Sequence, residues 1–256
     1  MGTRAVLGGE SEDQAAEAFI AASRKMIDPE TEFERELQIF GDDLVVAIQC
    51  FYVWLTVHAA ARKNRNVYDL LNRDAGFWNL AVGSIQANSL IALGRIFDTH
   101  RQSHNVKRLL KLAELNIAIF SKVALRKRKN KQSANAHEWI DNYMRNVHVP
   151  TASDFKRLWS FVDARRKVYG SCYKQLRDRV YAHKERTDIT GFVAKTNTRE
   201  LGRLLSDLQK LHNVLWDLLQ NGRKPRLSPL RHSAGHRIKR DTRKFLKLLV
   251  GSSISR

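Results

Sequence analysis

Apolar residues recur at every third or fourth position through most of this chain, which is the spacing of one face of an α-helix. Little interrupts this pattern, because the 256 residues include only 4 Pro and 13 Gly. The spacing predicts an all-α fold, an up-and-down helical bundle, with Gly41 as a candidate break in the first helix. The expected helices cover residues 31–62, 77–97, 105–120, 134–145, 151–185 and 197–220.

Capping signals and helix breakers divide the sequence further. The stretches "TASD" at Thr151–Asp154 and "NTRE" at Asn197–Glu200 are typical of helix starts. The stretch "LRKRKNKQS" between two expected helices is predicted to be a basic loop. The glycine and the two prolines in "NGRKPRLSP" are helix breakers and are expected to end the bundle. We therefore expect three parts: a polar N-terminal segment at 1–30, a helical domain at 31–220 and a basic C-terminal tail at 221–256.

Positive charge is concentrated in that tail. The chain has 45 Lys and Arg against 26 Asp and Glu, a formal net charge of +19. Residues 221–256 contain eleven Lys and Arg and one Asp, so this segment holds +10 of the +19. Such an excess predicts a polyanionic partner, nucleic acid first and an anionic membrane surface second.

Residues 237–250 of the tail have the pattern of a short basic amphipathic helix. We expect it to bind RNA phosphates without sequence preference, and its candidate RNA-binding residues are Lys239, Arg240, Arg243 and Lys244. Two alternatives stay open: a disordered segment that only improves solubility, and a docking segment for an acidic antitoxin protein.

The most apolar run, residues 44–61, is long enough for a tilted membrane crossing. Its polar residues Gln49, Thr56 and His58 argue against a span. We predict that it is the central helix of the bundle and that the protein has no membrane span and is cytoplasmic. Cys50 and Cys172 lie in apolar helical runs and are expected to be free thiols in a reducing compartment.

The helix expected from Thr151 ends its apolar face in charged residues. Steps of three and four residues from Phe155 place the following on one face: Leu158, Val162, Arg165, Tyr169, Cys172, Leu176, Arg179 and His183. Arg179 and His183 are four residues apart, so their side chains are neighbours. Arg177 lies roughly 240° around the helix from His183. Helix geometry therefore favours a pair of Arg179 with His183 over a pair of Arg177 with His183.

The stretch "RDRVYAH" resembles the signature of the HEPN (higher eukaryotes and prokaryotes nucleotide-binding) domains, in which an Arg with a polar follower is separated from a His by four to six intervening residues. Here these residues are Arg177, Asp178 and His183, with five residues between the Arg and the His. The second basic residue, Arg179, and the Ala before the His are similar to the AbiU-type abortive-infection branch.

A second stretch is similar to the upstream helix of the same branch. It is "FWNLAVGSIQANSLIALGRIFDTH", which starts with aromatic residues and closes on Arg95, Phe97 and Asp98. The resemblance covers about residues 31–220 and leaves the basic tail outside. The motif is short, and the upstream stretch makes the resemblance more specific.

The resemblance implies a metal-independent endoribonuclease without a cofactor, acting as a toxin or a phage-defence effector. It also implies a homodimer in which two copies of the motif face one cleft. Its implied catalytic residues are Arg177, Asp178 and His183, and its implied RNA-binding residues outside the tail are Arg179 and Arg95. Imidazole can transfer protons near neutral pH, and guanidinium binds phosphate oxygens as a fork.

Structural interpretations of the same residues remain. A His at a helix end is often only half-buried or a partner of the helix dipole, and the two Arg residues could form a solvated charge cluster. The chain would then be a non-catalytic helical protein that binds nucleic acid through its basic tail. His100 and His104 with Asp98 have a spacing conceivable for a metal, although solvent-facing histidines are the simpler interpretation.

Overall fold

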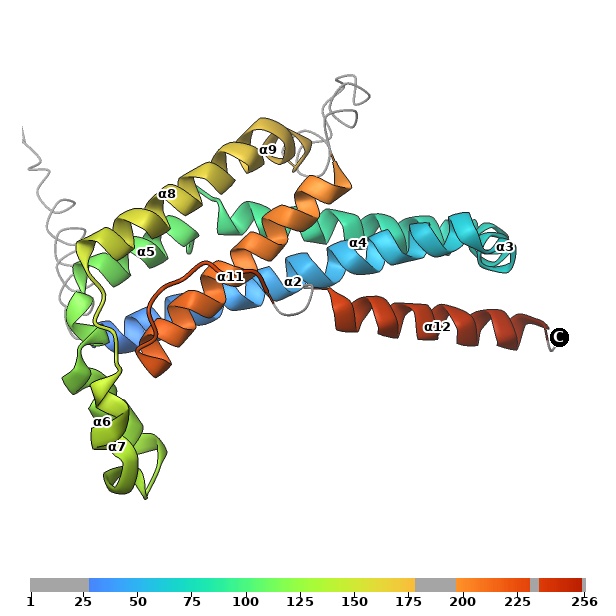
Figure 1. Cartoon of the computed structure of the whole chain (residues 1–256). Helices are drawn as coiled ribbons and strands as arrows, with labels where there is room; N and C mark the ends of the chain where they lie inside the picture. Colours follow the sequence, from blue (N-terminus) through green and yellow to red (C-terminus); the bar gives the residue numbers. More distant parts are fainter. Residues whose placement is uncertain (1–27, 178–196, 231–234, 255–256) are drawn as a thin grey trace, which may run out of the picture.

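A computed structural model describes residues 28–177, 197–230 and 235–254, and all regular elements within these ranges are helices (Figure 1). The all-α prediction is confirmed. The α-helices are α2 (Pro29–Lys63), α3 (Arg65–Arg73), α4 (Ala75–Ile96), α5 (Val106–Leu115), α6 (Lys122–Gln132), α7 (Ala136–Arg145), α8 (Ala152–Val168), α9 (Lys174–Leu176), α11 (Thr198–Asn221) and α12 (His236–Ile254). A 3₁₀-helix covers Ile117–Phe120, and a π-helix covers Tyr169–Tyr173.

The long helix α2 organises the fold. It begins at a cap in which the Asp28 carboxylate accepts the N–H of Thr31 at 3.1 Å, and it continues without a break through Gly41. The expected break is wrong. A Cβ at Gly41 would lie 2.7 Å from Nε2 of His212 on α11, so the glycine lets α11 approach closely. α4 runs along α2, and α11 crosses it (Figure 1).

By length and composition, α2 is a helix that could cross a membrane. In this structure it packs against α3, α4, α5, α11 and α12. Most of its buried apolar residues belong to the main hydrophobic core, which includes Phe33, Leu37, Phe40, Leu44, Ala47, Ile48 and Phe51. This packing supports the interpretation of α2 as the central helix of the bundle.

The predicted basic loop is a helix, and this prediction was wrong. α6 begins at Ser121, whose hydroxyl accepts the N–H of Ala124 at 3.2 Å. It pairs with α7 in an arm that extends from one end of the body (Figure 1). Within α6 a single apolar side chain, Leu125, enters the small core that this arm forms with Ile140, Met144 and Val147. A single buried apolar residue does not give the repeated helical spacing by which a helix can be predicted from the sequence.

Arg128 ties the arm to the body. Its side chain is only 6% exposed, and its Nη2 donates to the carbonyl oxygens of Ile119 and Leu219, both at 2.9 Å. Its Nη1 lies 2.7 Å from Oε2 of Glu30 at the start of α2. The guanidinium therefore satisfies helix-end carbonyls and a carboxylate at the place where three elements meet.

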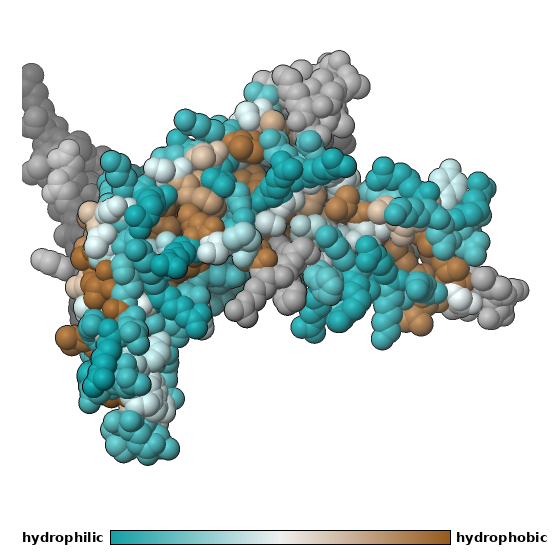
Figure 2. All heavy atoms as spheres, in the orientation of Figure 1, coloured by the Kyte–Doolittle hydropathy of each residue, from teal (hydrophilic) through white to brown (hydrophobic). Residues whose placement is uncertain are grey.

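The predicted tail helix is confirmed as α12, which extends a few residues beyond the expected range. It packs against α2 and α3 through Leu246, which is buried with Val57 and Val67. Figure 2 shows hydrophilic side chains over much of the outer surface of this helix. Its cationic residues are thus presented on an ordered element that is attached to the core.

Replacing Arg128 with Ala is expected to lower the free energy of unfolding by about 3 kcal/mol, because the Glu30 carboxylate and two carbonyl oxygens lose a buried partner. Chemical denaturation followed by circular dichroism measures this. The neighbouring exposed residue supplies the control: Lys127→Ala should change stability by less than about 0.5 kcal/mol. Equal stabilities of the two variants would contradict the role given to Arg128.

Candidate active site

The helix that leads to the motif passes through a π-turn at Tyr169–Tyr173, between α8 and α9. The N–H of Lys174 donates to the carbonyl of Tyr169, five residues earlier. A π-turn holds one residue more than an α-turn, so the residues that follow are rotated by roughly 100° compared with a continuous α-helix. Tyr173 is therefore buried in place of Cys172, which was expected on the buried face and is half-buried. Both cysteines are free, as predicted.

The same turn changes the position of Arg177. In a continuous α-helix Arg177 would lie roughly 80° around the axis from Tyr169, and the extra residue reduces this to roughly 20°. Arg177 thus shares the face of Tyr169, whose ring stacks on Phe97 of the α4 end at a centroid distance of 5.0 Å. The sequence placed Arg177 at the edge of the buried face, and the π-turn moves it onto that face.

Arg177 lies against the backbone of α4. A Cβ at Gly94 would be 2.5 Å from both Cδ and Nη1 of Arg177 and 3.2 Å from its Cζ. Gly94 is buried, and Phe97 follows it by three residues on the same helix. The contact of Gly94 with Arg177 therefore joins the two stretches that carried the family resemblance, and the stacking of Phe97 on Tyr169 lies earlier along the helix that leads to Arg177.

Asp98 stands at the end of α4, next to these contacts. Its Oδ2 accepts the hydroxyl of Ser103 at 2.7 Å, and its Oδ1 accepts the N–H groups of Thr99 at 2.7 Å and His100 at 3.1 Å. The Ser103 hydrogen bond lowers the pKa of Asp98 most; the His100 and Thr99 N–H groups and the Arg177 charge add to this, while burial opposes it. These groups favour the ionised form of Asp98, and the Arg177 charge contributes least among them.

Arg95, predicted to bind RNA, is tied to α2. Its Nε and Nη2 both lie 2.7 Å from Oδ1 of Asp43. The Arg95 side chain remains 55% exposed, whereas Asp43 is 15% exposed. The pair anchors the last turn of α4 to α2 and leaves one side of the guanidinium facing solvent.

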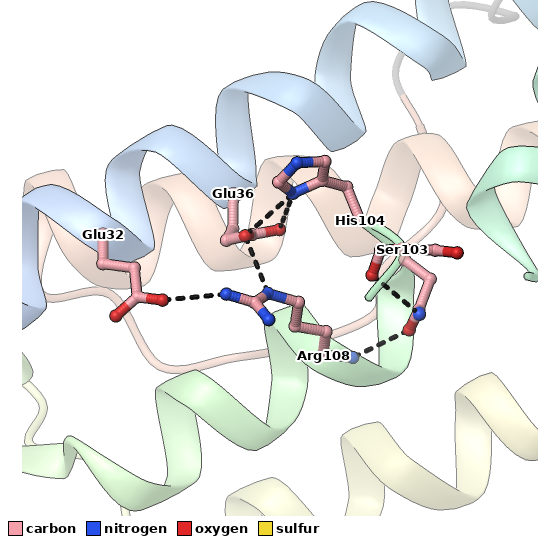
Figure 3. A network of polar contacts seen from close by, with 6 residues as sticks. Glu32, Glu36, Ser103, His104 and Arg108 are labelled. Atoms are coloured by element: carbon pink, nitrogen blue, oxygen red, sulfur yellow. Dashed lines mark hydrogen bonds and ion pairs between the residues drawn. The ribbon is translucent and has the colours of Figure 1, made fainter. Parts of the chain in front are cut away.

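His104 belongs to a different network, which is drawn in Figure 3. Its Nδ1 lies 2.9 Å from Oε1 of Glu36, a carboxylate that is 2% exposed. Arg108 donates to Glu36 from Nε at 2.8 Å and to Glu32 from Nη2 at 2.9 Å. This network fastens the start of α5 to α2. Within the described part of the chain, no three His, Cys, Asp or Glu residues gather as metal ligands would.

A family model for AbiU2 proteins of the HEPN group matches residues 30–240. The chain belongs to the HEPN AbiU2 family. The match covers most of the chain and reaches into the first turns of α12. Searches of curated proteins and of solved structures found no match.

Three predicted residues of the HEPN motif, Asp178, Arg179 and His183, lie outside the described residues, and the expected Arg179–His183 pair stays a prediction. The structure does bring Arg177 together with the end of α4. Gly94 is a residue that sequence reasoning missed. The available signal was a glycine inside an apolar helical run, where alanine is more stable and close packing often explains the exception.

The predicted RNA-binding residues of α12 differ in their surroundings. Lys239 is half-buried, with Nζ 4.0 Å from the centre of the Tyr52 ring, and burial followed by the charge of Arg243 lowers its pKa. Arg240, Arg243 and Lys244 are exposed, and Nε of Arg240 lies 3.2 Å from a carboxylate oxygen of Asp241. The last three are thus better placed to reach a phosphate than Lys239.

Replacing Asp98 with Asn should lower the thermal midpoint at pH 7 but not at low pH. A carboxylate whose pKa is lower in the folded than in the unfolded chain stabilises the fold above its unfolded pKa, about 3.9, and this is lost as pH falls through the folded value. The midpoints of wild type and Asp98→Asn should converge between pH 7 and pH 3 in differential scanning calorimetry. A constant difference over that range would contradict this account.

Proposed function

We propose that this HEPN AbiU2 protein is an endoribonuclease that acts in the cytoplasm as a toxin or an abortive-infection effector. The observation that carries the proposal is the joining of Arg177 with the Gly94–Asp98 end of α4. A charged guanidinium in contact with α4, at the start of a motif that contributes an imidazole, provides two kinds of group that phosphodiester cleavage needs.

The proposed reaction needs only groups of the chain and of the RNA. The 2′-hydroxyl attacks the adjacent phosphorus, its proton passes to a base, and the 5′-oxygen leaves with a proton from an acid. The products are a 2′,3′-cyclic phosphate and a 5′-hydroxyl. His183 is the proposed proton-transfer group, and Arg177 and Arg179 bind the phosphate oxygens as charge develops on them. Asp178 is the polar follower of Arg177 in the motif, and we propose that it helps to orient these groups.

We further propose that the protein is a homodimer that an antitoxin protein restrains. α4 supports the dimer because three large apolar side chains on it are exposed, Phe77 at 65%, Leu80 at 71% and Ile91 at 36%. Phe77 and Leu80 are one turn apart, and Ile91 lies about three turns further along the same face of the helix that also carries Gly94. Two copies of a chain with a net charge of +19 repel each other, so an uncharged stripe is the surface on which they can meet.

Sedimentation velocity tests the dimer. Leu80→Glu should shift the protein from dimer to monomer, because it places a like charge on both sides of the interface. Val123→Glu changes a side chain that is 80% exposed on α6, and it should leave the dimer intact. A monomeric wild type, or a dimer in both variants, would count against the interface.

The second candidate function is nucleic-acid binding without catalysis. The exposed cations Arg240, Arg243 and Lys244 on an ordered helix favour it, because such a surface binds phosphate backbones without base contacts. In this case the motif would contribute charge only.

Incubation of purified protein with total RNA in the presence of a chelator separates the two functions. Wild type should cleave the RNA, and His183→Ala should reduce the rate by about 100-fold or more. His137→Ala, which changes an exposed imidazole on α7, is the matched control and should keep the wild-type rate.

A triple variant of α12, Arg240→Gln, Arg243→Gln and Lys244→Gln, completes the comparison. For a ribonuclease it should weaken RNA binding, while cleavage at saturating RNA continues. If wild type does not cleave, or if His183→Ala keeps its toxicity in cells while the α12 variant loses it, the protein binds nucleic acid without catalysis. Equal cleavage by wild type and His183→Ala would contradict the role given to His183.

A further inference from the structure

Gly94 stands in the last turn of α4, at the place where the Arg177 side chain needs room. The described α4 also contains Gly76 and Gly83, and a Cβ at either would meet no atom within 4 Å. At Gly94 the Cβ would meet Cδ and Nη1 of Arg177 at 2.5 Å. Glycine is the least favourable helix residue apart from proline, so its presence here needs a reason. The contact with Arg177 supplies one.

We propose that Gly94 is a positioning residue that forms a notch in α4 and fixes the guanidinium of Arg177 for phosphate binding. This inference rests on the proposed ribonuclease function and adds a residue that the HEPN motif does not contain. The notch is the space that the missing side chain of Gly94 leaves on α4. The side chain of Arg177, which follows the π-turn, enters this space.

The π-turn sets the register that the notch requires. Without the extra residue Arg177 would be rotated by roughly 100° and would not face α4. The turn is held by partners on both sides: Tyr169 stacks on Phe97, and the Tyr173 hydroxyl donates to the carbonyl of Asn197 at 3.0 Å. π-turns are less stable than α-turns and are frequent at functional sites. Here the turn directs the first charged residue of the motif toward α4.

Asp98 sets the charge at the end of the notch. Its oxygens already accept the Ser103 hydroxyl and two backbone N–H groups, which fix the carboxylate in place. Arg177 therefore lies along Gly94, and the Asp98 carboxylate, just beyond the end of α4, adds a negative charge whose field reaches the guanidinium. A guanidinium held in this way loses less conformational freedom when it binds a phosphate, which favours a well-defined geometry in the transition state.

The test compares two glycine substitutions in the same helix, Gly94→Ala and Gly83→Ala. Both add one methyl group and raise the helix propensity of α4. In Gly94→Ala the methyl group displaces the flexible Arg177 side chain, so the fold should persist. The maximal cleavage rate should fall roughly 100-fold, with a smaller change in the RNA concentration at half-maximal rate. Gly83→Ala should cleave as wild type does.

Two further measurements keep this inference separate from the proposed function. Arg177→Lys removes the fork and reports whether cleavage depends on the guanidinium at all. The Arg177 Nε–H signal in NMR spectra, assigned through its loss in Arg177→Lys, reports on position without any reaction. It should shift in Gly94→Ala and stay unchanged in Gly83→Ala.

The outcomes divide clearly. If wild type cleaves, Arg177→Lys does not, and the two alanine variants have equal rates, Gly94 has no positioning role. If wild type does not cleave RNA, the ribonuclease proposal fails. If Arg177→Lys cleaves as well as wild type, the guanidinium of Arg177 has no role in cleavage. In either case the NMR measurement by itself still tests whether Gly94 positions Arg177. Equal Arg177 signals in the two alanine variants would contradict this role.

Discussion

The packing of α4 on α2 is the constraint on which the candidate site depends. The Ser89 hydroxyl donates to the carbonyl of Ala47 at 2.9 Å in the buried contact, and Arg95 pairs with Asp43 at the end of it. These contacts fix one face of α4 on the central helix. The other face is then available to Arg177 and Tyr169, so the part of α4 that Arg177 approaches is held by core contacts.

The acidic residues of this strongly basic chain have a structural part in the fold. Glu36 is buried and joins His104 and Arg108 to α2, and Glu30 meets the buried Arg128. Asp154 is buried as well, and at the start of α8 its carboxylate contacts Thr151, His148 and Arg157. Buried carboxylates of this kind need cationic or N–H partners, which this chain has in excess. The cations of α12 that are exposed lie on the surface, where a polyanion can reach them.

The fold followed from the sequence wherever the helical pattern was strong. α2, α4, α8 and α11 were predicted because each has enough apolar residues at helical spacing to define a face. α6 was not predicted, because it has no apolar face at helical spacing. Its single apolar core residue, Leu125, packs against residues of α7. At the site, Arg177 and Asp98 were named from the sequence through the family resemblance. Gly94 was not, because its role lies in what approaches it.

The amino-acid order by itself determined the helical class, the capping of α8 and α11, the amphipathic α12 and the excess of positive charge. These depend on residues near one another in the chain. Only the tertiary structure decided which way Arg177 faces, because a single π-turn changes the phase of a helix without changing the residue spacing. It also decided that Arg177 contacts Gly94. Local sequence patterns do not predict such a contact, because the two residues lie far apart in the chain.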